Sequence, residues 1–113
     1  MNRSIESIMT WLTEQVQSKQ IISPQQYVEA AAYLNILKGE EDSKLIQLKS
    51  DVAKMRQDLL PRSKSVAEVK LIIEASDKYR EMKLQEAYLE RIEETIKISK
   101  LYARLKNDEV KHY

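Results

Sequence analysis

Residues 59–68 read LLPRSKSVAE and lie between two long runs of strong helix formers. Pro61 lacks an amide donor and disfavours helical geometry in the residue before it, so the first run should end there. Ser65 and Glu68 have the spacing of a capping box, in which a serine oxygen accepts a hydrogen bond from an amide of the new helix. The stretch therefore predicts a turn of about five residues that joins two helices as an antiparallel hairpin.

The rest of the chain is also typical of helices. One glycine, two prolines and 33% charged residues leave few loops, and the apolar residues recur at spacings of three and four. Ser23 begins a second capping box, with Pro24 at the first helical position and Gln26 at the third. The predicted helices cover residues 4–18, 24–60 and 66–108. We expect an all-α fold, with a short N-terminal helix and a long antiparallel helical hairpin in a single domain, residues 1–113.

The apolar stripes of the two long helices indicate what each packs against. In the middle helix the heptads slip at Gly39, so a continuous helix with a kink or soft point is predicted there. The last helix carries one stripe suited to the hairpin: Ile72, Ala75, Tyr79, Met82, Leu89, Ile92, Ile96 and Ala103. A second stripe lies on another face: Leu84, Tyr88, Ile98, Tyr102 and Leu105. Because exposed apolar stripes on long helices are usually interfaces, we expect a homo-oligomer joined through the second stripe.

The composition argues against catalysis. The chain has no cysteine, one histidine and one glycine, so thiolate chemistry, cysteine-based zinc sites and glycine-rich phosphate loops lack their residues. The acidic residues of the last helix alternate with basic ones at spacings that favour ion pairs. We therefore expect a protein that is not an enzyme and has no metal and no cofactor. The absence of a long apolar run or a signal peptide pattern predicts a cytoplasmic protein.

The net charge is only +1, but basic residues gather around the predicted turn. Between residues 49 and 70 there are six lysines and arginines against three acidic residues. A loop of this charge ahead of a helix N-terminus suits phosphate. The candidate phosphate contacts are Lys54, Arg56, Arg62 and Lys64. A second basic cluster, in residues 97–111, complements the negative end of the last helix and needs no ligand.

Three segments carry a resemblance to a known family: QYVEAAAYLNIL (26–37), VAKMRQDLL (52–60) and SVAEVKLIIEASDKYREMKLQEAYLERIEETI (65–96). They resemble the UvsY-like phage recombination mediator family, whose members are small, helical, oligomeric and non-catalytic. The family helps load a RecA-type recombinase onto single-stranded DNA held by a single-strand-binding protein. The resemblance implies the same DNA, recombinase and binding-protein partners here. It also implies a DNA contact at Lys54 and Arg56, which match the family's Lys-x-Arg motif.

The same features leave a different class of function open. A small phage or mobile-element protein could use its helical surface on a protein partner, as an inhibitor of a host defence enzyme, an assembly adaptor or a virion component. Such a protein would not bind DNA in a salt-sensitive way.

Overall fold

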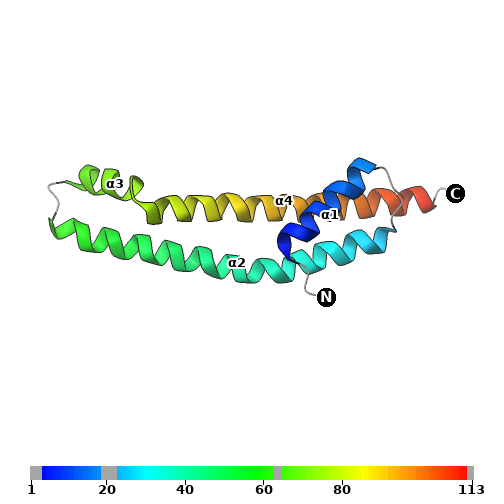
Figure 1. Ribbon diagram of the computed structural model, residues 1–113, viewed down its shortest axis with the longest axis horizontal. Helices are drawn as coiled ribbons and strands as arrows, with labels where there is room; N and C mark the ends of the chain where they lie inside the picture. The colour runs from blue at the N-terminus through cyan, green and yellow to red at the C-terminus, as the bar shows by residue number, and fades with distance from the viewer. Residues whose placement is uncertain (1–3, 19–22, 63–64, 112–113) are drawn as a thin grey trace. The chain divides into compact units, whose positions relative to one another are not determined.

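A computed structural model of the chain describes residues 4–18, 23–62 and 65–111, and the side chains of residues 4–17, 23–62 and 65–105 (Figure 1). The helices are α1 (Ile5–Ser18), α2 (Pro24–Leu59), α3 (Val66–Glu74) and α4 (Asp77–Lys111), with a 3-10 turn, η1, at Leu60–Arg62. The described residues contain no strand. Helix α2 packs against α4, so the predicted all-α helical hairpin is confirmed.

Serine side chains fix where three of the helices begin. The Oγ of Ser4 accepts a hydrogen bond from the Ser7 amide at 3.1 Å, so Ser4 caps α1 from outside rather than forming its first residue. At the start of α2, the Oγ of Ser23 accepts from the Gln26 amide at 3.4 Å and the Ser23 amide donates to Gln26 Oε1 at 3.0 Å, so both bonds of the predicted capping box are present. The Oγ of Ser65 accepts from the Glu68 amide at 3.1 Å, as predicted for the helix after the turn.

The last predicted helix, residues 66–108, is wrong in one respect, because it breaks between Glu74 and Asp77. Ser76 makes the break: its Oγ accepts from the Tyr79 amide at 3.2 Å and donates to the Ile73 carbonyl at 2.6 Å. One hydroxyl therefore caps the N-terminus of α4 and also satisfies a carbonyl at the end of α3. The Tyr79 amide is a group that a helix start otherwise leaves unpaired, whereas the Ile73 carbonyl also accepts from the Ser76 amide at 3.0 Å.

The chain divides into two compact units, and α2 and α4 run through both. The first unit contains residues 1–39 and 90–113, and the second contains residues 40–89. One division point is Gly39, at the slip in the heptads, where α2 continues as a single helix as predicted.

The first unit is built from α1, the start of α2 and the end of α4. Ile8, Leu34 and Ile92 come from these three helices in turn and are each at most 2% exposed. Burial of one such side chain contributes roughly 1.5–3 kcal/mol, which explains how the short α1 is held. Around this core Lys38 pairs with Glu93 at 3.3 Å.

The second unit has its own core. Its buried residues are Val52 from α2, Val69 and Ile73 from α3, and Met82 from α4. We expected Ile72 and Ala75 on this side of the helix, but both are exposed. A continuous helix turns 100° per residue, so its buried positions follow one regular spacing. The break at Ser76 interrupts this spacing, and the buried positions of α3 are shifted by about one residue relative to those of α4.

Candidate functional site

Four basic residues of the second unit lie near the turn between α2 and α3 in the sequence. We call them the basic tip: Lys54, Arg56, Arg62 and Lys70. All four are exposed, and none forms an ion pair within the part of the second unit that the structure describes. Lys64, which the sequence also placed here, lies outside the described residues.

Three other cations of the same unit are paired, whereas Lys49 and Arg80 have no ion pair within the described residues. Lys44 lies 3.0 Å from Glu41, and Lys83 lies 3.3 Å from Glu86. Lys78 similarly has a carboxylate 3.6 Å away. Since exposed ion pairs hold side chains in place and reduce their attraction for other anions, the basic tip has positive charge that the chain does not itself neutralise.

A cavity of about 290 Å³ opens at the basic tip, and we call it the tip cavity. Its walls come from α2, η1, α3 and the first turn of α4. It is lined by Arg56, Leu60, Val66, Val69, Lys70, Ile73, Glu74 and Tyr79. The lining combines an apolar floor with two cations and one carboxylate, so the site suits an amphipathic anion better than a bare ion.

Of the predicted contacts that the structure describes, Lys54, Arg56 and Arg62, only Arg56 lines the tip cavity. Lys54 precedes it by two residues, which is 200° around a helix, so the two cations flank the packed face of α2 on opposite sides. Val52 and Met55 occupy the face between them, as buried and half-buried residues. The structure therefore does not bring Lys54 and Arg56 to one point, and Arg62 lies beside the cavity in η1 without lining it.

Sequence reasoning missed Lys70 as a site residue. In one continuous helix Lys70 would lie nine residues, or two and a half turns, before Tyr79 and thus on the opposite face. The break at Ser76 changes that relation, and both residues line the tip cavity. The pair Ser76-Asp77, a capping residue followed by an acidic residue, is the signal that could have located the break.

Tyr79 supplies the aromatic ring of the tip cavity. The Nζ atom of Lys83 lies 5.4 Å from the ring centroid, within the range of a cation–π contact. A hydrogen bond to Glu86 is the main cause of the raised pKa of Lys83, so this ammonium stays charged. Tyr79 is only partly buried and is one of the residues that line the cavity.

The second apolar stripe, through which we expect protomers to join, contains both exposed and half-buried residues. Leu84 is 65% exposed, and Ile98 and Leu105 are about half exposed. Tyr88 and Tyr102 are half-buried. The ring of Tyr102 stacks on Tyr27 within the first unit, with centroids 5.8 Å apart and planes at 22°. Tyr102 thus has a ring partner in its own chain, and self-association through this stripe stays a prediction.

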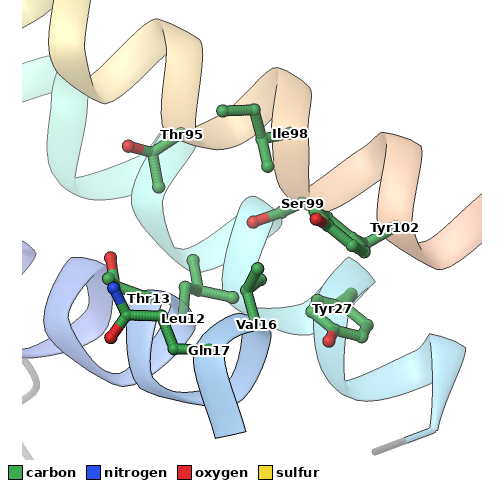
Figure 2. A pocket seen from close by; sticks show the side chains of 9 residues that line it. All are labelled: Leu12, Thr13, Val16, Gln17, Tyr27, Thr95, Ile98, Ser99 and Tyr102. Atoms are coloured by element: carbon green, nitrogen blue, oxygen red, sulfur yellow. The ribbon is translucent and has the colours of Figure 1, made fainter. Parts of the chain in front are cut away.

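The first unit holds a second cavity, of about 230 Å³, between α1, α2 and α4 (Figure 2). It is lined by Leu12, Thr13, Val16, Gln17, Tyr27, Thr95, Ile98, Ser99 and Tyr102. None of these side chains is a carboxylate, an imidazole or an amine. Because no lining group is charged at neutral pH, the cavity offers no acid–base pair for catalysis.

The part of the chain that the structure describes has no grouping of metal ligands and no helix that could span a membrane. No protein-family model, curated protein or solved structure matches this chain. Among the described residues, no three histidine or acidic side chains come together as metal ligands would. No described helix has a stretch long and apolar enough to cross a bilayer. The basic tip and its cavity are therefore the strongest candidate site.

Proposed function

We propose that this chain is a non-catalytic, oligomeric accessory protein that binds single-stranded DNA through the basic tip. The observation that supports it most is that the four cations of the basic tip have no carboxylate partner among the described residues, whereas Lys44, Lys78 and Lys83 of the same unit have one. Lys49 and Arg80 are also unpaired there, so what supports the proposal is the number of unpaired cations near the turn. Unneutralised lysines and arginines bind phosphates and release the counterions condensed on the strand.

The finer role follows the family resemblance. The protein helps to load a RecA-type recombinase onto single-stranded DNA that a single-strand-binding protein holds, in the cytoplasm of the host cell. One tip offers only a few phosphate contacts and binds weakly. A homo-oligomer repeats the tip, and linked weak sites reach a higher overall affinity through effective concentration.

The test is the salt dependence of binding to a short single-stranded oligonucleotide. For single strands the logarithm of the affinity falls by about 0.7 per phosphate contact for each tenfold rise in salt. Replacing both Lys54 and Arg56 by alanine should therefore lower the affinity and flatten the slope by roughly 1.4 per binding tip.

The matched control removes two paired cations instead, with Lys44→Ala and Lys97→Ala in one chain. Lys97 lies 3.8 Å from Glu94 in the first unit. This control has the same net charge as the tip variant and should keep nearly the full slope. Equal affinity and slope in the tip variant and the wild type would contradict the assignment of these two residues.

A second candidate function has its own support. The outer face of α3 exposes two large apolar side chains, Leu71 at 69% and Ile72 at 42%. Such surface suits a protein partner, as in an inhibitor of a host enzyme, an adaptor or a virion component. Light scattering after size exclusion, with and without the oligonucleotide, separates the candidates. A protein that self-associates and ignores DNA supports this second one.

A further inference from the structure

We infer that the tip cavity takes one unstacked base of a single strand, while Lys70 and Arg56 hold the phosphates on either side of that base. The inference rests on the proposed function and adds to it. It assigns Lys70 and Tyr79 to the site, and it predicts that the protein recognises a base as well as the charged backbone.

The first argument is the chemistry of the lining. Leu60, Val66 and Ile73 give the cavity an apolar surface, whereas Arg56 and Lys70 are exposed at its edge. A nucleotide has the matching division into a flat, largely apolar base and a charged phosphate. A site for phosphate alone would have no use for an apolar floor, since charged groups lose hydration against such a surface.

The second argument is size. A volume of about 290 Å³ is roughly ten times the ~30 Å³ that one water molecule occupies in the liquid. This is enough room for the ring and substituents of one base.

The third argument is the aromatic wall. Bases bound to proteins without strong sequence preference stack on aromatic side chains, because every base has a π-face. Tyr79 is the aromatic residue of the tip cavity. A paired duplex keeps its bases stacked inside, so only a single strand can offer a base to this wall.

The carboxylate of Glu74 sets a limit on where phosphate lies. It lines the same cavity as the two cations, and like charges repel. The phosphates are therefore expected at the outer edge, beside Arg56 and Lys70, with the base further in.

The experiment compares two strands that have the same number of phosphates, a thymidine oligonucleotide and an abasic strand of equal length. The full-length protein is titrated against each labelled strand at one salt concentration, with fluorescence anisotropy as the readout. Because one base stacked on an aromatic ring adds on the order of tenfold in affinity, the wild type should bind the thymidine strand about that much more tightly.

Two variants assign the residues. Tyr79→Leu keeps an apolar side chain but removes the ring, so the ratio of the affinities for the thymidine and abasic strands should fall toward one. Tyr33→Leu is its control, since Tyr33 is an exposed tyrosine of the first unit. Lys70→Ala changes only an exposed side chain and should weaken binding to both strands, whereas Lys100→Ala in the first unit should not.

The outcomes separate the two proposals. Equal binding of both strands by the wild type overturns the base site and leaves single-strand binding standing. No binding of either strand overturns both. A folded Tyr79→Leu protein that keeps the full preference, or a Lys70→Ala protein that binds as tightly as Lys100→Ala, also overturns the base site.

Discussion

Removing the Ser76 hydroxyl tests the break that shapes the second unit. In the structure this group accepts from the Tyr79 amide at 3.2 Å and donates to the Ile73 carbonyl at 2.6 Å. Ser76→Ala leaves both backbone groups without that partner. Loss of a serine cap costs about 1 kcal/mol, within a range of roughly 0.5–2 kcal/mol. Ser76 lies outside both helices, so the helix propensity of alanine has little effect there and the central value of about 1 kcal/mol applies.

The expectation is a loss of roughly 0.5–1.5 kcal/mol in the free energy of unfolding. For a chain of this size that corresponds to a fall of roughly 2–6 °C in Tm. Urea unfolding followed by far-UV circular dichroism measures the loss. The slope of the unfolding free energy against urea concentration should be the same in the variant and the wild type.

The matched control is Ser50→Ala, an exposed serine within α2. No cap is lost there, so the substitution should be neutral or slightly stabilising. If Ser76→Ala is as stable as Ser50→Ala, the reasoning is refuted. The helix would then run through residue 76 and bury Ile72 and Ala75, as the sequence alone suggests.

Three further predictions concern single side chains. Gln85 donates to Glu41 Oε2 at 2.7 Å, and this bond is the main cause of the lowered pKa of Glu41. The stabilisation from this hydrogen bond is present above pH 4.5, the ordinary pKa of a glutamate, and is lost as the pH falls through the pKa of Glu41 in the folded protein. Gln85→Ala should therefore raise the pKa of Glu41 in an NMR titration. Leu34 is 0% exposed, so Leu34→Ala should cost about 2–5 kcal/mol in urea unfolding, whereas Ile36→Ala, at an exposed position, should cost under about 0.5 kcal/mol. Glu74→Gln removes the carboxylate of the tip cavity, so anisotropy titrations should show tighter binding of the thymidine and abasic strands alike.

The sequence predicts the hairpin well because short local motifs mark the residues at which the helices begin. Ser23 and Ser65 each stand three residues before a glutamine or glutamate, and the caps observed at both serines agree. At Ser76 the third residue onward is Tyr79, which cannot complete a capping box. No proline or glycine precedes it, so helix propensity alone extends the helix through the break.

The candidate site is less predictable, because it depends on the angle between segments rather than on composition. Charge counting finds Arg56, and the structure places it at the tip cavity. The same count selects Lys54, although the helical repeat turns it 200° away from Arg56. Lys70 is missed because the sequence predicts one continuous helix through Ser76. The break shifts α3 by about one residue in the helical repeat, and a shift of one residue turns a side chain by 100° around the helix.

The break, the cavity and the basic tip are best understood together. With an unbroken helix, Lys70 and Tyr79 would lie on opposite faces, and no single ligand could touch both. The cap at Ser76 ends α3 after nine residues and brings a cation, an apolar floor and an aromatic ring to one cavity. If the base site is real, Ser76→Ala should lose part of its preference for thymidine over abasic strands, even where the protein stays folded. A purely structural cap would lower stability and leave that preference unchanged.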